Sequence, residues 1–261
     1  MIIQESFVDA RGRARHRFSR ECPVCGATMP GYRPLLLGDV DQISKSLPEH
    51  NLFFFDRVSP GNLQLARRSR AQGALVFFEP SGIGDEEMFV ECVRVAHVLK
   101  YSHERLSDLD APLKGSTVEL EIETQGERGL RFRTRKGARI GAWHSLAALE
   151  APSVVDTAGS GDWCTAGLME RIGSHRNAVA ALGDIEEIKE ALRFGQALAA
   201  LNCGYEGARG LMYVATRSAV LKTVEKLLAD EVAKLPTSRT SEPDASKPCV
   251  VCSSVLEAAH G

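Results

Sequence analysis

A seven-residue stretch, Asp156-Thr157-Ala158-Gly159-Ser160-Gly161-Asp162, combines residue types that could bind an anion and move a proton. The apolar spacing that follows it, from 163 to 170, predicts a helix. Glycines at a helix start let the backbone turn tightly, and the free N–H groups there lie at the positive end of the helix dipole, which favours a bound anion. Asp162 adds a carboxylate beside that anion. The combination suits phosphoryl transfer, in which amides hold the moving group and a carboxylate takes a proton from an attacking hydroxyl.

The same stretch could instead be an Asp- and Gly-rich turn that caps an ordinary helix. Its residues closely resemble the Asp-Thr-x-Gly-Ala-Gly-Asp signature of the ribokinase-like (PfkB-type) sugar and nucleoside kinases, with Ser160 in place of the usual Ala. The resemblance implies that Asp162 is the catalytic base, and that the phosphate-binding anion hole comprises Thr157, Gly159, Ser160 and Gly161. It also implies an enzyme that uses ATP and magnesium to phosphorylate a hydroxyl of a sugar or nucleoside-like small molecule.

Two further stretches resemble the nucleotide side of these kinases. The turn from 124 to 129 is similar to the family's Thr-x-Gly-x-x-Gly motif, which implies nucleotide contacts at Thr124, Gly126 and Gly129. A long amphipathic helix expected over 185–202 precedes a Gly-rich turn similar to the one that borders the adenine, where the matching residues are Gly207 and Ala208. An ordinary core helix with a Gly stop would produce the same residues.

The chain also departs from the family pattern. Glu79-Pro80-Ser81 stands where family strands end in Asp-Pro-Asn, and the stretch from Leu99 to Arg105 stands where the family has Leu-Lys-x-Asn-x-x-Glu. The Asn and Glu of that motif, which help to place metal and phosphate, are Ser102 and Arg105 here, with Glu104 available one position away. These departures leave a second hypothesis open, a non-catalytic binding or regulatory subunit that keeps the kinase fold and is stapled by zinc.

The elements that must position these residues alternate along the chain. Short apolar runs predict buried strands at 51–56, 74–80 and 96–100, and helices are expected near 39–47, 60–71, 85–93 and 217–233. Residues 117–122 and 130–135 alternate as strands, and we interpret the second run's arginines (131, 133 and 135) as solvent-facing. Continuous apolar strands separated by helices indicate an α/β fold, a doubly wound and mostly parallel sheet with helices on both faces. The ribokinase-like fold has this architecture.

We expect three parts in the chain. Residues 1–34 would hold a lid-type β-hairpin, with strands at 2–8 and 14–19, and a Cys-x-x-Cys knuckle; residues 35–235 would form the α/β nucleotide-binding core; and residues 236–261 read as a flexible linker with a cysteine tail. The resemblance covers the later two-thirds of the family pattern. A truncated gene model, a partner chain that supplies the N-terminal part, or a degenerate kinase would each explain this, and a homo-oligomer is a further option.

Two Cys-x-x-Cys pairs, Cys22 with Cys25 and Cys249 with Cys252, each have the spacing of half a zinc site. Their four thiolates would complete a tetrahedral structural zinc site, and the linker is long enough for the tail to fold back. A redox pair or two unrelated thiol pairs are the alternatives. The remaining cysteines (92, 164 and 203) are expected to be small core residues.

Composition narrows the class of protein. The 261 residues carry a formal net charge of −2, which gives no overall attraction to nucleic acid or to an anionic membrane. No apolar run is long enough to span a bilayer and no signal peptide opens the chain, so a soluble cytoplasmic protein is expected. Seven cysteines, an odd number in a chain of this length, do not indicate a secreted disulfide framework.

Overall fold

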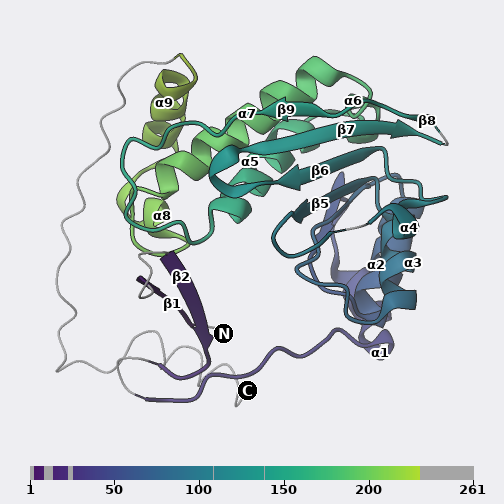
Figure 1. Ribbon diagram of the computed structural model, residues 1–261. Coiled ribbons are helices and arrows are strands. Elements are labelled where there is room, and N and C mark those ends of the chain that lie inside the picture. The colour runs from purple at the N-terminus through teal and green to yellow at the C-terminus, as the bar shows by residue number, and fades with distance from the viewer. Residues whose placement is uncertain (1–2, 9–13, 23–25, 108, 138, 230–261) are drawn as a thin grey trace.

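The computed structural model of the protein describes residues 3–8, 14–22, 26–107, 109–137 and 139–229 (Figure 1). Within these ranges the main sheet has seven strands in the order β3-β4-β5-β6-β7-β8, with β9 also paired to β7. A second, two-stranded sheet holds the hairpin expected near the start of the chain, β1 (Ile3–Val8) and β2 (Ala14–Ser19). None of the described helices is long and apolar enough to cross a lipid bilayer.

The main sheet is parallel in one half and antiparallel in the other. Its parallel strands are β3 (Leu52–Phe55), β4 (Leu75–Phe78), β5 (Val98–Ser102) and β6 (Leu120–Thr124). The antiparallel strands are β7 (Leu130–Lys136), β8 (Arg139–Ile140) and β9 (His144–Leu146). The expected doubly wound, mostly parallel sheet is confirmed.

Helices cover both faces of this sheet, and β4 has apolar side chains on both of its sides. Val76 and Phe78 of β4 point into a core formed with α2 (Pro60–Ala71), α3 (Glu86–Val95) and α4 (Asp110–Leu113). Leu75 and Phe77 point the other way, into a core formed with α5 (Ser160–Gly173), α6 (Ala178–Ala181) and α7 (Ile185–Asn202). Burial of each of these phenylalanine side chains contributes about 1.5–3 kcal/mol.

The remaining helices pack around these layers. The first, α1 (Leu37–Ser46), lies against α2, whereas α8 (Gly210–Val214) and α9 (Arg217–Leu228) pack against α7. Most helix boundaries follow the sequence expectation. Ser59, for example, caps α2 by accepting a hydrogen bond from the Asn62 N–H at 3.2 Å, directly before a proline at the first helical position.

The strand expected at 51–56 is present, but the expectation that it is buried was wrong. In the described sheet β3 lies at the edge and pairs with β4 alone. The Phe55 side chain is buried at 4% exposure, whereas Phe54 is 40% exposed. An apolar run cannot by itself distinguish a central strand from an edge strand, because both have the same composition.

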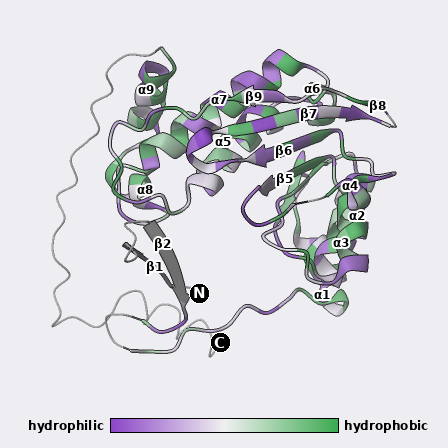
Figure 2. Ribbon diagram, in the orientation of Figure 1, coloured by the Kyte–Doolittle hydropathy of each residue, from purple (hydrophilic) through white to green (hydrophobic). Residues whose placement is uncertain are grey.

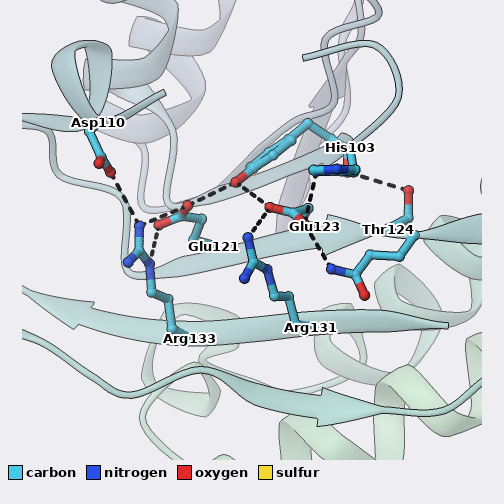
Figure 3. Close-up of polar contacts among 9 residues, drawn as sticks. His103, Asp110, Glu121, Glu123, Thr124, Arg131 and Arg133 are labelled. Atoms are coloured by element: carbon cyan, nitrogen blue, oxygen red, sulfur yellow. Dashed lines mark hydrogen bonds and ion pairs between the residues drawn. The ribbon is translucent and has the colours of Figure 1, made fainter. Parts of the chain in front are cut away.

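The arginines of β7 were expected to face solvent, and this was also wrong. Figure 2 shows the alternation of hydropathy along β7, and Figure 3 shows where its charged side chains go. Arg131 lies opposite Glu123, and Arg133 lies opposite Glu121, across the β6–β7 pair. Each arginine bonds its glutamate at 2.7 Å, and the glutamate residues are only 1% and 3% exposed. The interior strand β6 buries both faces, so its carboxylates require charged partners.

Neighbouring groups extend this β6–β7 ion-pair network, defined by Glu121, Glu123, Arg131, Arg133 and Arg135. Arg135 bonds the Glu121 carboxylate at 3.1 Å, and the Tyr101 hydroxyl of β5 lies 3.1 Å from the same carboxylate. Trp143 stacks on the guanidinium groups of Arg131 and Arg133, whose Cζ atoms lie 4.4 and 4.3 Å from the centroid of the indole ring.

The network also changes the pKa of the Glu123 carboxyl. Burial favours a higher pKa for this group, but hydrogen bonds from Arg131 and Gln125 outweigh that effect and lower the pKa.

Helices α5 and α7 approach each other unusually closely. A Cβ atom on Gly195 would lie 2.4 Å from the Cys164 carbonyl oxygen, and one on Gly167 would lie 2.6 Å from the Gly195 Cα. Only glycine fits at either contact without a shift of backbone. This close packing fixes α5 against α7, and the buried Leu168 and Ile172 of α5 pack against the sheet.

Candidate functional site

The signature stretch forms the loop before α5 and the first turn of that helix. Gly159 is the N-cap residue, with φ of 72° in the left-handed region, and no side chain caps the helix. In the described part of the chain, the backbone N–H groups of Gly161 and Asp162 have no acceptor. The Asp162 side chain is exposed, and a Cβ on Gly161 would meet nothing within 4 Å. The first turn therefore presents free donors and a carboxylate to solvent.

Gly159 also lies directly against the turn that contains Gly207 and Ala208. A Cβ on Gly159 would lie 2.7 Å from the Ala208 Cβ and 2.8 Å from its carbonyl oxygen. Both the positive φ and the close approach require glycine there. The structure thus brings together the signature and the second predicted nucleotide-binding turn, which are separated by more than forty residues in sequence.

Three polar side chains fasten these two turns to each other. Asp156 accepts from the Ala158 N–H at 2.9 Å and from the Gly207 N–H at 3.0 Å. Asn202, fully buried at the end of α7, donates to the Ala158 carbonyl at 3.1 Å and accepts from the Leu211 N–H at 3.2 Å. The Trp163 indole donates to the Ala208 carbonyl at 2.9 Å. Sequence reasoning assigned no role to Asn202 or Trp163, although a polar residue ending an apolar helix face is the kind of signal that could have found Asn202.

Beneath the first turn of α5 lies a triad of the buried residues Lys100 and Thr165 and the partly buried Glu79. Glu79 follows β4, Lys100 belongs to β5, and Thr165 lies one turn into α5. The Lys100 side chain is 2% exposed, and its ammonium donates to the Glu79 carboxylate and lies 3.4 Å from the Gly161 carbonyl oxygen. The Thr165 hydroxyl lies 2.6 Å from the other Glu79 oxygen. The carboxyl ends of two parallel strands therefore meet the helix start, the usual place for a ligand in this kind of sheet.

The residues that depart from the family pattern lie at the end of β5. Ser102 is half-buried, whereas Glu104 and Arg105 are exposed. His103 Nδ1 lies 3.3 Å from a Glu123 oxygen, which connects this loop to the β6–β7 network (Figure 3). That Glu104 replaces the missing acidic residue stays a prediction.

The turn after β6 contains the other predicted nucleotide-binding residues. Gly126 and Gly129 have φ of 62° and 97°, and a Cβ on Gly129 would lie 2.2 Å from the Leu146 carbonyl oxygen. The Thr124 hydroxyl donates to the Tyr101 carbonyl at 3.3 Å. The contacts of this turn thus run to β5 and β9. Among the described residues, no hydrogen bond joins it to the signature loop.

The predicted zinc site falls largely outside the described residues, which include Cys22 but not Cys25, Cys249 or Cys252. Cys22 is buried beside Met29. In the part of the chain that is described, no cluster of three or more His, Cys, Asp or Glu could hold a metal ion. The remaining cysteines are buried, as expected for core residues, and burial raises the pKa of the Cys92 thiol to about 12.

A family model and several solved structures of kinases are similar to this chain. The model of the pfkB family carbohydrate kinases matches residues 63–213. The fold is similar to that of ribokinase from Giardia lamblia, with a TM-score of 0.63, 19% identity, and coverage of 85% of this chain and 71% of that one. It is also similar to a fructokinase with bound ATP from Xylella fastidiosa, with a TM-score of 0.61, 21% identity, and coverage of 86% and 73%.

A third similar structure is the Burkholderia thailandensis nucleoside kinase in complex with inosine, with a TM-score of 0.57, 18% identity, and coverage of 87% of this chain and 68% of that one. A search of curated proteins finds no match. At these identities the solved structures establish the fold, and the expected ribokinase-like architecture is confirmed.

Proposed function

The chain belongs to the pfkB family of carbohydrate kinases, and from this premise we propose that it transfers a phosphoryl group from ATP to a hydroxyl of a sugar or nucleoside-like small molecule. The observation that carries the proposal is the first turn of α5. It combines an uncapped helix start, free N–H groups at Gly161 and Asp162, and an exposed carboxylate on the same turn.

In the proposed reaction each part of this turn has a distinct task. Gly159, Ser160 and Gly161 line the anion hole, and the free N–H groups of Gly161 and Asp162 stabilise charge on the transferring phosphoryl group, with the α5 dipole adding to their field. The Ser160 N–H already donates to the Thr157 carbonyl at 3.2 Å. Thr157, exposed in the preceding loop, borders the same anion. The Asp162 carboxylate accepts the proton of the attacking hydroxyl. Its exposure leaves it accessible to a substrate.

The residues present fit a nucleotide phosphate, because unpaired backbone donors at a helix start are the groups that bind one. Gly207 and Ala208 contact the signature loop directly, which supports a place for them at the nucleotide. Thr124, Gly126 and Gly129 are proposed as its outer contacts. Magnesium is usually held by phosphates and only one or two carboxylates, so it would arrive with the nucleotide and neutralise charge on the phosphate oxygens.

Asp162→Asn is the decisive variant, compared with Glu170→Gln on an exposed position of the same helix. We expect Asp162→Asn to lower kcat by about 10²–10⁴-fold, since general-base catalysis contributes about that much, while the Kd for ATP changes less than about threefold. Glu170→Gln should keep both values. Steady-state kinetics with a panel of sugars and nucleosides, and calorimetric titration with Mg-ATP, measure the two quantities. Comparable turnover in Asp162→Asn would exclude the assigned base.

A second candidate function is favoured by Ser102 and Arg105, which replace the family's Asn and Glu. A non-catalytic, nucleotide-binding subunit would bind Mg-ATP with saturation and phosphorylate none of the acceptors. The absence of ATP binding to the folded protein would contradict both candidates.

A further inference from the structure

We propose that Lys100 is a positioning residue, which holds the peptide unit between Gly161 and Asp162 in the orientation that phosphoryl transfer requires. The inference rests on the function proposed above, because it gives that peptide unit a task. The inference gives a role to the buried Lys100 ammonium. Neither the signature residues nor the proposed reaction explains why this charge is buried there.

The burial of Lys100 calls for a specific explanation. Lysine is almost never fully buried unless its charge is paired, and this residue is 1% exposed in an interior strand of the sheet. Its ammonium donates to Glu79 on one side and faces the Gly161 carbonyl oxygen at 3.4 Å on the other. An apolar side chain would fill the space at lower cost, so the partners of the charge indicate its purpose.

The partner on the helix is informative because of peptide geometry. The Gly161 carbonyl and the Asp162 N–H belong to one planar trans peptide unit, so they point in opposite directions. A donor that holds the carbonyl on the sheet side therefore holds the N–H on the solvent side. That N–H is one of the unpaired donors at the helix start, and the next Cα carries the proposed base.

Glycine at position 161 makes such a restraint useful. A glycine loses more conformational freedom on folding than any other residue. This one lies in the first turn of an uncapped helix, where the Asp162 N–H has no helical acceptor. The Lys100 ammonium therefore adds a restraint on the carbonyl side of a peptide unit whose N–H side is left without a partner by the helix.

Thr165 and Glu79 complete the restraint. The Thr165 hydroxyl lies 2.6 Å from a Glu79 oxygen and 3.0 Å from the Gly161 carbonyl oxygen, and its single proton can serve one of these acceptors at a time. Glu79 neutralises Lys100, so the charge beneath the positive end of α5 is balanced. The triad thus ties the ends of β4 and β5 to one carbonyl in the helix start.

The test uses variants that remove either the Thr165 hydroxyl or both charges of the Glu79–Lys100 pair. Thr165→Val removes the hydroxyl with little change in shape, and Thr165→Ser keeps it. The double variant Glu79→Gln with Lys100→Met removes both charges together, so neither is left buried alone. We expect kcat to fall about 10–100-fold in Thr165→Val and in the double variant, with the Kd for ATP changed less than about threefold, since the lost contact orients the site and does not bind the nucleotide. Thr165→Ser should restore kcat to within about threefold of wild type.

A second readout does not depend on turnover. In protein labelled with ¹⁵N-aspartate, the Asp162 amide resonance is identified by its loss in Asp162→Asn. We expect it to shift or broaden in Thr165→Val and in the double variant, and to keep its position in Thr165→Ser. This measurement decides the inference even when the wild-type chain shows no kinase activity.

The outcomes separate cleanly. A merely structural role of Lys100 predicts a lower melting temperature with unchanged kcat and an unchanged Asp162 resonance in the folded double variant, and this result would overturn the inference. Inactive wild-type protein whose Asp162 resonance still responds to the double variant would refute the proposed function but keep the positioning role.

Discussion

Two groups of buried charges lie on the same sheet, and they differ in what they leave unpaired. In the β6–β7 network, Glu121 and Glu123 are each held by arginines from the neighbouring strand (Figure 3). The Tyr101 hydroxyl lies within hydrogen-bond range of both carboxylates. Around Lys100, the charges are also paired, but the helix start above them keeps free N–H groups and an exposed carboxylate. Buried charge alone therefore does not indicate a site; unpaired donors beside it do.

The physical cause of the difference is the kind of element involved. Antiparallel strands place side chains directly opposite one another, so each carboxylate on β6 meets a guanidinium on β7 and its hydrogen-bonding capacity is used. A helix start leaves backbone donors that the helix itself cannot use. Because Gly159 has no side chain to cap them, they stay available for a ligand.

The largest effect on stability is expected from Glu121→Gln, which breaks the β6–β7 network. The variant leaves Arg133 and Arg135, which are 15% and 8% exposed, without their full counter-charge. Removal of one partner of a buried pair costs about 3–5 kcal/mol, so we expect a loss of that order in urea unfolding. Asp110→Asn is the matched control, because the Asp110 side chain is 97% exposed and lies 3.7 Å from Arg133. It should cost less than about 0.5 kcal/mol.

A smaller loss of stability is expected from Gly159→Ala, which disrupts the close contact between the signature loop and the Gly207–Ala208 turn. The left-handed φ costs about 1–2 kcal/mol, and the contact of 2.7 Å with Ala208 adds a similar amount. Affinity for Mg-ATP should fall as well, because the two turns separate. Gly161→Ala is the control for stability, since its Cβ would meet nothing within 4 Å. Equal melting temperatures for the two variants would contradict the close packing of these turns.

The smallest effect on stability is expected from protonation of His97. This side chain is buried in its neutral form, in contrast to the paired charges of the other two groups. Its Nδ1 accepts a hydrogen bond from the Val76 N–H at 2.9 Å, and burial lowers its pKa to about 4. The resulting stability is fully present above the unfolded pKa of about 6.5 and is lost as the pH falls towards 4. We expect a loss on the order of 2 kcal/mol between pH 7.5 and pH 4.5.

The control for this prediction is His97→Asn, whose side-chain oxygen can accept the same hydrogen bond without taking up a proton. Its unfolding free energy should fall less over this pH range, by about the His97 contribution. Identical pH dependence in the two proteins would show that other groups cause the acid sensitivity.

Much of the fold could be predicted because it depends on local patterns. The helix that starts at Pro60 has its Ser cap and proline in the sequence, and the apolar run in β4 shows that both faces of that strand are covered. The signature residues were also identifiable, since a glycine-rich helix start with a carboxylate is a local feature. Their arrangement at the first turn of α5 agrees with that reading, while their roles in catalysis await the variants described above.

Other features depend on neighbours that no local pattern identifies. The apolar run of β3 does not show that the strand lies at an edge, and alternating arginines on β7 look the same whether they meet water or buried glutamates. Asn202, Trp163 and Lys100 each contact a carbonyl group at least 44 positions away in the sequence. The amino-acid sequence alone determined the order of elements and the residue types of the signature at the start of a helix, because both arise from residues close in the chain. Which charges are paired and which donors stay free was decided by tertiary packing alone, because burial and pairing are properties of the surroundings.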